Sequence, residues 1–417
     1  MFSSLNIRIG LFLAMRQIRR TSLWTTGLIV FVMVLTFLNL VVLTGILVGL
    51  VQGSVDAHRT QYTSDIIISN LNEKSYIENS PAIIATIKSL AQVDSISARY
   101  RQGGTLEANY KIRKETDKPN TAAAQIIGID PVAEDAITNI SKNIIEGEYL
   151  SPADYDQIVV GAFLLKKYVP VDSPGFAALD NVAPGAKIRV RVNGIHREVT
   201  VKGILKSKVQ DISQNAYMVD SQFRSMIGRN DGNVAEIAVK LKAGADPLAV
   251  RAALVRNGID KVAKVQTYAD AQPKFLKDII STFNTLGTML SSIGLLVASI
   301  TIFIVIFINA LTRKKFIGIL KGIGINGKAI EISYVFQSIF YALCGSVIGF
   351  VIVYAVLVPL IAAHPIDFPF SDGILVAPLN QTLLRMGLLI LSTVIAGYIP
   401  ARMIIRKNTL DSILGRT

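Results

Sequence analysis

Residues 21–55 read TSLWTTGLIVFVMVLTFLNLVVLTGILVGLVQGSV, a run of 35 residues without one charged side chain. About 20 mostly apolar residues are enough for a helix to cross the hydrocarbon core of a membrane. Two more uncharged runs, 279–312 and 332–366, contain 34 and 35 residues. A core helix of a soluble protein rarely stays uncharged for so long, so these three runs predict membrane-spanning helices.

A fourth run is shorter, because only 16 uncharged residues separate Arg385 from Arg402. At 1.5 Å per residue they would span roughly 24 Å, less than the ~30 Å hydrocarbon core. A helix that begins near Leu379 reaches the required length if Arg385 extends its charged end to the interface. We predict a full span here, and a re-entrant or surface helix is the alternative.

The composition agrees with a membrane protein. Of the 417 residues, 51% are hydrophobic and 18% charged, whereas soluble domains average about 25% charged residues. The single cysteine, Cys344, excludes a disulfide framework. The three histidines are far apart in the sequence and do not indicate a metal site.

The charges next to the runs predict the orientation. Residues 1–22 contain four arginines and no acid, and residues 312–330 contain five basic residues and no acid. Lys and Arg concentrate in cytoplasmic segments, so both termini and the 312–330 loop are expected in the cytoplasm. The net charge of +13 comes mostly from such short segments. Topology and anionic lipid account for that charge, and nucleic-acid binding is not expected.

The expected fold class is an α-helical membrane protein with four transmembrane helices and a large extracytoplasmic α+β domain between helices 1 and 2. We expect these segments: an amphipathic cytoplasmic or interfacial helix at 1–22, spans at 23–51, 281–311, 331–360 and 380–404, an extracytoplasmic domain at 52–280, a cytoplasmic loop at 312–330, an outer loop at 361–379 and a cytoplasmic tail at 405–417. The apolar side of the first helix is expected at Ile7, Leu11, Ala14 and Ile18.

The large domain shows alternating strands and short helices. Strands are predicted at 65–69, 122–129, 157–160, 187–192, 197–204 and 236–241, and helices at 81–93, from 132 onward, and at 247–257. Asn193-Gly194 lies between two alternating runs and predicts a hairpin. The acidic residues are dispersed, with no pair that suggests a catalytic dyad. We therefore expect a folded binding or coupling module.

A glycine-rich segment, GIGINGK at 322–328, fits the spacing of a phosphate-binding loop. That loop also needs a Ser or Thr hydroxyl for Mg²⁺ directly after the lysine, and Ala329 stands there. No buried strand is expected before it. We interpret the segment as a break between two helices and expect no catalytic, cofactor-binding or metal-binding residue in the chain.

The preceding residues predict a short amphipathic helix that follows a basic cluster. The basic residues are Arg313, Lys314 and Lys315, and the apolar residues Phe316, Ile319, Leu320 and Ile323 recur at helical spacing. Such a helix suits docking into a groove on a cytoplasmic partner. The alternative is a helix that lies on the membrane surface.

Apart from Glu331, the first residue of the third predicted span, the spans contain few polar residues and no acidic or lysine side chain of the kind that forms an ion relay. Two glycine pairs, Gly45 with Gly49 and Gly345 with Gly349, have the GxxxG spacing that lets helices approach closely. Ordinary membrane-helix composition is the alternative explanation for these glycines.

Several segments together resemble the MacB/FtsX/LolC-E superfamily of ABC transporter permeases. They are LFLAMRQIRR at 11–20, RKKFIGILKGIG at 313–324, which is similar to the coupling helix of the family, and IPAR at 399–402 followed by LDSI at 410–413. GIDP at 128–131 and IEGEY at 145–149 resemble the LolC/LolE group. Two positions differ: Phe316 stands where the family has an acid, and Gly322 where it has alanine.

The resemblance implies a permease subunit in the bacterial inner membrane, in a dimer with a second copy or a paralogue. It implies that a separate cytoplasmic ABC ATPase holds ATP and Mg²⁺ and contacts residues 313–323. Its hydrolysis would drive export or membrane extraction by mechanotransmission, and a periplasmic adaptor or carrier is a further expected partner. The substrate stays open among lipoprotein, lipid, peptide and drug. The alternatives are an FtsX-like regulator of outside enzymes that transports nothing and, less favoured, a membrane sensor or enzyme.

Overall fold

The computed structural model describes residues 4–112, 114, 118–169, 177–364, 366–368, 371–373 and 375–405. Residues 406–417 of the predicted tail, with the LDSI segment, lie outside the described residues. The chain divides into two compact units. One contains 1–51, 278–367 and 372–417, and the other contains 52–277 and 368–371. We call them the helical unit and the sheet unit.

The helical unit is built on four long apolar helices, as predicted. They cover Leu23–Thr63, Leu276–Thr312, Gly327–Ala363 and Leu379–Ile405. The fourth has 27 residues, or about 40 Å at 1.5 Å per residue, so it is long enough for a complete span. The α+β domain lies between the first and second of these helices in the sequence, which confirms the predicted fold class.

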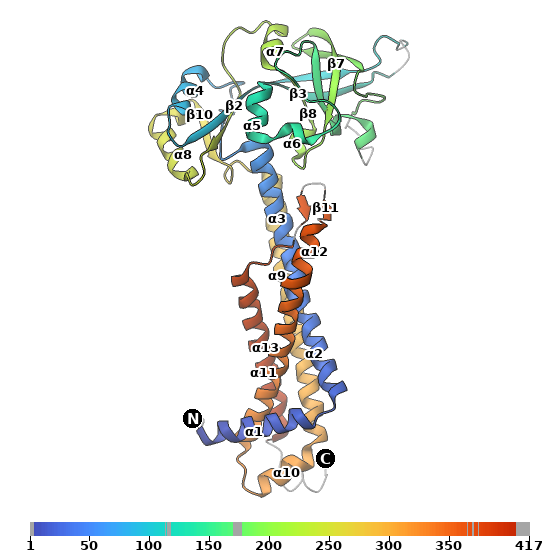
Figure 1. Cartoon of the computed structure of the whole chain (residues 1–417), viewed down its shortest axis with the longest axis vertical. Helices are drawn as coiled ribbons and strands as arrows, with labels where there is room; N and C mark the ends of the chain where they lie inside the picture. The colour runs from blue at the N-terminus through green and yellow to red at the C-terminus, as the bar shows by residue number, and fades with distance from the viewer. Residues whose placement is uncertain are drawn as a thin grey trace. The chain divides into compact units, whose positions relative to one another are not determined.

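The elements of the helical unit are the following: α1 (Ser4–Arg20), α2 (Leu23–Leu38), η1 (Asn39–Leu43), α3 (Thr44–His58), α9 (Lys274–Thr312), α10 (Lys314–Gly322), α11 (Gly327–Ile352), η7 (Val353–Leu357), α12 (Val358–Ala363) and α13 (Leu379–Ile405). The long helices run alongside one another, and α1 crosses the bundle at the end where α10 lies (Figure 1). Their core contains Met33, Phe37, Ile302, Tyr334 and Leu389.

The glycine-rich segment after α10 is a turn between two helices. Gly324 has φ +93°, a conformation that favours glycine. The N–H of Ile325 donates to the carbonyl of Leu320 at 3.0 Å, which closes the end of α10. Asn326 then caps α11, because its Oδ1 accepts from the N–H of Lys328 at 3.0 Å.

The sheet unit contains these elements: β1 (Ile66–Asn70), α4 (Ser80–Lys88), β2 (Val93–Glu107), β3 (Thr121–Ile129), α5 (Pro131–Thr138), β4 (Ile144–Gly147), β5 (Gln157–Gly161), β6 (Lys187–Val192), β7 (Ile195–Leu205), α6 (Gln210–Ser213), β8 (Asn215–Val219), α7 (Asp220–Met226), β9 (Glu236–Leu241), α8 (Pro247–Arg256) and β10 (Ala263–Thr267). A small pair, β11 (Ile366–Phe368) and β12 (Ser371–Gly373), comes later in the chain. The sheet order is β10-β1-β9-β2-β3-β8-β5-β7-β4, with β6 paired to β2 and β7.

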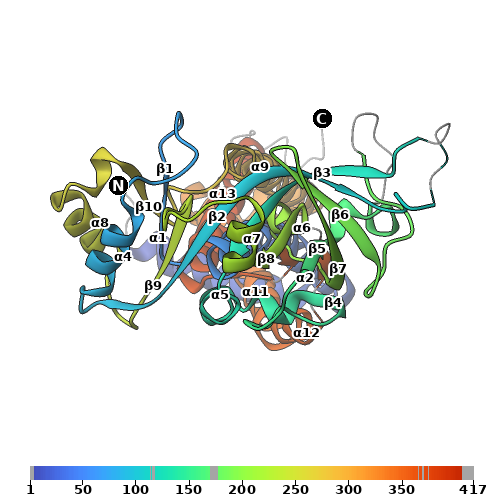
Figure 2. The ribbon, with the colours of Figure 1, turned by 90° about the horizontal axis from the view of Figure 1, so that it is seen from above.

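Strand β2 belongs to both lobes of the sheet unit. Residues 93–99 pair with β9, while residues 100–107 pair with β3 (Figure 2). One core packs around β1, β9, β10, α4 and α8, and another packs around β3, β5, β6, β7 and β8. The 15 residues of β2 thus join the two lobes through a continuous backbone ladder.

The predicted strands are confirmed with small shifts of their ends, and so is the hairpin. Val192 pairs with Ile195 across a turn in which Asn193 has φ +47° and Gly194 φ +82°, as a type I′ turn requires. The predicted helix 81–93 was too long, because α4 ends at Lys88. The next residues turn, and Val93 already begins β2.

Candidate functional site

Helix α10 divides its apolar side chains between the core and solvent. Ile317 and Leu320 are buried in the core of the helical unit, while Phe316, Ile319 and Ile323 expose 47%, 53% and 71% of their surface. The expectation that Leu320 belongs to the outward face was wrong, since it points into the same core as Ile317. The exposed apolar face of α10 therefore consists of Phe316 and Ile319, together with Ile323 directly after the helix.

The basic residues around α10 lie at both of its ends. Arg313 precedes the helix, and its Nη2 donates to the Thr21 hydroxyl at 3.3 Å. Lys314 and Lys315 form its first turn, with Lys315 exposed. Lys321 donates to the carbonyl oxygen of Ile405 at the end of α13. These contacts fix α10 against the ends of its neighbouring helices.

Helix α1 packs on the start of α11 through a stripe of small and polar residues. A Cβ on Gly10 would lie 2.6 Å from Cγ2 of Ile332, so only glycine permits this approach. Gln17 is buried, and its Oε1 accepts from Nε2 of Gln337 at 2.6 Å.

The expected apolar side of α1 is divided between the surface and the bundle. Ala14 is buried, but Ile7 and Leu11 are exposed, and Ile18 is only half-buried. The buried stripe of the helix is Gly10, Leu13, Ala14 and Gln17. The packed side of α1 contains the polar Gln17, which is the hydrogen-bond partner of the buried Gln337.

The glycine pair on α11 lies directly against α2. A Cβ on Gly345 would overlap Met33, and one on Gly349 would overlap the ring of Phe37. The two helices therefore approach at these positions as closely as the GxxxG spacing allows.

The pair on α3 has a different environment. A Cβ on Gly45 would lie 2.7 Å from Cδ1 of Leu375, and the N–H of Val376 donates to the Gly45 carbonyl at 3.2 Å. Gly45 thus accommodates the extended segment before α13 instead of another long helix. Gly49 is buried.

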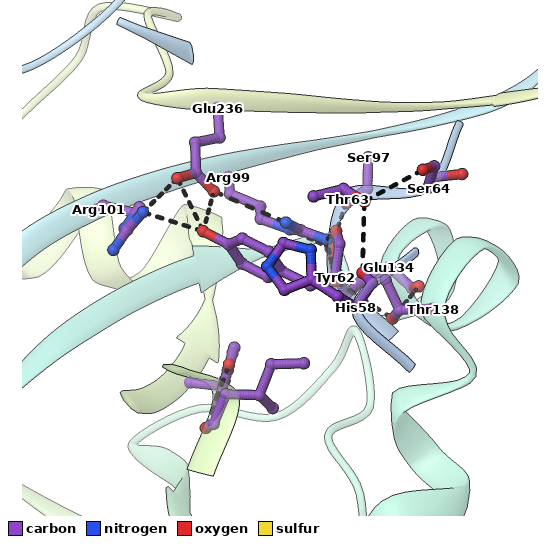
Figure 3. A network of polar contacts seen from close by, with 12 residues as sticks. His58, Tyr62, Thr63, Ser64, Ser97, Arg99, Arg101, Glu134, Thr138 and Glu236 are labelled. Carbon is purple, nitrogen blue, oxygen red and sulfur yellow. Dashed lines mark hydrogen bonds and ion pairs between the residues drawn. The ribbon is translucent and has the colours of Figure 1, made fainter. Parts of the chain in front are cut away.

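A buried ion network in the sheet unit was not predicted. Its centre is Arg99 on β2, and its first partner is Glu134 on α5 (Figure 3). The Nε and Nη2 of Arg99 donate to the two carboxylate oxygens of Glu134 at 2.9 and 2.7 Å. Ser97 and Thr138 donate to the same carboxylate at 2.6 and 3.2 Å. Glu134 is therefore paired through both oxygens, as a buried carboxylate must be.

The network continues to β9 and to the turn that follows α3. Nη1 of Arg99 lies 3.6 Å from Glu236, which also pairs with Arg101. The hydroxyl of Tyr62 donates to Glu236 at 3.0 Å, and the Tyr62 carbonyl accepts from Nη2 of Arg99 at 2.8 Å. The ring of His58 packs edge-on against Tyr62 with centroids 5.3 Å apart. Four separate segments of the chain thus meet at one arginine.

The electrostatics of this network favour the charged form of its two arginines. Burial by itself lowers the pKa of Arg99, but the carboxylates of Glu134 and Glu236 raise that pKa above its ordinary value. The pKa of Arg101 is raised in the same way, against its own burial, by Tyr62 and Glu236. The two arginines thus remain charged beside their carboxylate partners, and the network links β2, α5 and β9. Among the described residues, no group of three or more His, Cys, Asp or Glu could hold a metal ion.

Two family models match the chain. The MacB-like periplasmic core domain matches residues 26–257, more than half of the sequence, and the FtsX-like permease C-terminal model matches residues 288–409. The second model includes α10 and its flanking residues. Together the two models cover most of the helical unit and of the sheet unit.

Curated relatives agree with these models. An uncharacterized ABC transporter permease of Methanocaldococcus jannaschii is 27% identical over 228 residues, 52% of this chain and 55% of that protein. The macrolide export ATP-binding/permease protein MacB of Campylobacter fetus subsp. fetus is 24% identical over 225 residues, 52% of this chain and 33% of that protein. The aligned part thus spans about half the length, or less, of these relatives.

Two solved structures are similar to this chain at low identity. The periplasmic region of MacB from Actinobacillus actinomycetemcomitans has a TM-score of 0.37 at 16% identity, over 51% of this chain and 92% of that one. The extracellular domain of the ABC-type transporter YknZ from Gram-positive bacteria has a TM-score of 0.32 at 13% identity, over 48% and 98%.

Proposed function

Because the chain belongs to the MacB/FtsX superfamily of ABC transporter permeases, we propose that it converts ATP hydrolysis by a cytoplasmic ABC ATPase into movement of its extracytoplasmic domain. The observation that carries this proposal is the exposed apolar face of α10, beside basic residues and inside the segment matched by the FtsX-like model. Exposed apolar side chains at helical spacing suit insertion into a groove on a partner. ATP and Mg²⁺ would be bound by the ATPase, outside these 417 residues.

The proposed orientation places α1, α10 and both termini in the cytoplasm of a bacterial inner-membrane protein. The supporting observation is the excess of arginine and lysine in residues 1–22 and 312–330, where no acid occurs. The sheet unit would then work outside, in the periplasm.

The proposed assembly contains a second permease, either a copy or a paralogue. Helix α9 supports this, because Met289, Ile293, Leu296 and Ile300 recur on one side of the helix and are exposed. Such a stripe can contact lipid or a second helix bundle, and the family resemblance favours the second bundle. A periplasmic adaptor or carrier would complete the pathway.

The proposed activity is export, or extraction from the membrane, of a substrate handled by the sheet unit. A MacB relative is named for macrolide export, while the segments at 128–131 and 145–149 resemble permeases of lipoprotein release. The first of these segments also has a structural role, since Asp130 caps α5 by accepting from the N–H groups of Val132 and Ala133 at 3.0 and 3.2 Å. The substrate class is accordingly left as lipoprotein, lipid, peptide or drug.

Co-purification of the ATPase with detergent-extracted permease tests the coupling role of α10. Phe316 and Ile319 each expose about half of their surface, and burying a whole Phe or Ile is worth about 1.5–3 kcal/mol. Phe316→Ala with Ile319→Ala should therefore lose about 1.5–3 kcal/mol of docking free energy, a drop in affinity of about 10- to 150-fold. A membrane-surface helix would show no such loss.

A matched control is Phe31→Ala with Leu35→Ala, which removes comparable exposed side chains from α2. It should leave ATPase binding unchanged. Equal retention of the ATPase by the Phe316/Ile319 variant and by the unmodified chain would remove the basis of the proposal.

A further inference from the structure

A cavity of about 240 Å³ lies between α1 and the start of α10. Its lining residues are Leu13, Arg16, Gln17, Arg20, Arg313 and Phe316. We call it the arginine pocket. It is contributed by two segments that are almost 300 residues apart in the sequence, and a hydrogen bond from Arg313 to Thr21 joins these segments.

The arginine pocket carries three positive charges, and no described residue of the chain is their counter-ion. Residues 4–20 and 313–330 contain no acidic residue at all. Among the residues that the structure describes, none of the three guanidinium groups has an ion-pair partner. Three guanidinium groups around one small cavity repel one another, and a bound anion with several oxygens would relieve that repulsion through charge-assisted hydrogen bonds.

The surroundings of the pocket indicate a lipid anion. Leu13 and Phe316 add apolar surface to the same cavity. Three residues beyond Arg20, the exposed side chains of Leu23, Trp24, Leu28 and Phe31 line an apolar groove on α2. Tryptophan concentrates at the level of the lipid headgroups, so Trp24 marks the membrane interface next to the pocket. A headgroup site and an acyl-chain groove thus follow one another along the chain.

We propose that the arginine pocket binds the phosphate headgroup of an anionic phospholipid. The guanidinium groups of Arg16 and Arg20 come from α1, and that of Arg313 comes from the residue before α10. A lipid phosphate bound by these three guanidinium groups would hold α1 and the start of α10 together. Basic pockets beside transmembrane helices bind anionic headgroups in this way. The proposal is independent of which ATPase meets α10.

Energy transfer from tryptophan to lipid tests the proposal directly. Trp24 is the single tryptophan of the chain, so its transfer to a pyrene-labelled acyl chain reports the lipids around this part of α2. The full chain is reconstituted in phosphatidylcholine vesicles with a trace of pyrene-labelled phosphatidylglycerol or of pyrene-labelled phosphatidylcholine. We expect an association constant about tenfold or more in favour of phosphatidylglycerol. Equal transfer to the two lipids in the unmodified chain would overturn the proposal without any variant.

Two double variants distinguish specific binding in the pocket from nonspecific attraction of anionic lipid to the basic surface. Arg16→Gln with Arg313→Gln should reduce the preference to about threefold or less. Arg8→Gln with Arg19→Gln removes the same charge from exposed residues of α1 that do not line the pocket, and should keep the preference. If both variants reduced the preference for phosphatidylglycerol equally, the lipid would be attracted by surface charge alone, and the proposed binding site would be refuted.

Two more measurements exclude other occupants. Inorganic phosphate at constant ionic strength should leave the lipid preference intact, and its loss would assign the pocket to free phosphate. If Arg16→Gln with Arg313→Gln kept the lipid preference while losing the ATPase, the pocket would be a protein contact and the lipid proposal would fall.

Discussion

Replacing Arg99 by methionine removes the one cation that joins Glu134 and Glu236. The guanidinium and the two carboxylates are almost completely buried, with side-chain exposures of 2%, 3% and 7%. Methionine retains most of the volume and apolar stem of the side chain. The change therefore tests charge and hydrogen bonding with little loss of packing.

The expected loss of stability in Arg99→Met comes from the two buried carboxylates that lose this cation. Glu134 loses both of its bonds to Arg99 and keeps Ser97 and Thr138 as partners. Removing one partner of a buried ion pair costs about 3–5 kcal/mol, because an uncompensated charge stays in the interior. Glu236 still has Arg101 and Tyr62, so the main loss should be at α5.

Hydrogen exchange of the full chain in detergent, followed by mass spectrometry, measures this cost locally. Peptides from β2 and α5 should exchange about 10²- to 10⁴-fold faster in Arg99→Met, since each 1.4 kcal/mol is a factor of ten. Arg99→Met combined with Glu134→Met should recover part of the protection, because the uncompensated carboxylate is then absent.

Arg197→Met is the matched control in the same sheet unit. Arg197 pairs with Asp156, but both side chains are partly exposed, and such pairs contribute about 0–1 kcal/mol. If Arg99→Met changed exchange in β2 and α5 no more than Arg197→Met does in its own strand, the network would not hold these segments together.

The remaining predictions concern topology and helix packing. After Cys344→Ser removes the native thiol, a cysteine placed at the exposed Asn193 should react with an impermeant reagent from outside, and one at the exposed Asn326 should not; the reverse pattern would invert the topology. Gly345→Leu should overlap Met33 and destabilise the bundle by about 1–3 kcal/mol or more, seen as a lower midpoint of thermal unfolding in detergent. Gly387→Leu should have little effect, since nothing lies within 4 Å of a Cβ there, and an equal midpoint for the two variants would argue against close packing at Gly345.

The sequence predicts the long helices and most short strands because their patterns are local. Strand β2 was missed, although it is the longest in the sheet unit. Ser97, Arg99 and Arg101 alternate along one face of the strand. Because this buried face is polar, the strand lacks the apolar alternation by which strands are predicted. Gly103-Gly104 also looks like a break, yet Gly104 is needed there: a Cβ would lie 2.8 Å from the carbonyl oxygen of Arg191 on β6.

The buried network could not be predicted for a related reason. Glu134 and Glu236 lie 35 and 137 residues from Arg99 in the sequence, and each of them alone resembles a surface charge. The alternation of Ser97, Arg99 and Arg101 was the available local signal, since arginines at i and i+2 of one strand share a face. The outward face of α10 was assigned incorrectly at Leu320 because a nine-residue helix at the end of a bundle shows no periodicity that separates core from solvent.

The pairing of β1 with β10 has a consequence for biosynthesis. Ile66 lies opposite Thr267. The first strand of the domain therefore cannot pair with the last until some 200 more residues have been synthesised. Contacts of such separation fold slowly, because a long loop must close before they contribute. Lys274, the first residue of α9, follows Thr267 by only seven positions. The sheet can therefore close only as the second span leaves the ribosome. Until then one edge of β1 stays unpaired, and a translocating chain must keep that edge from aggregating.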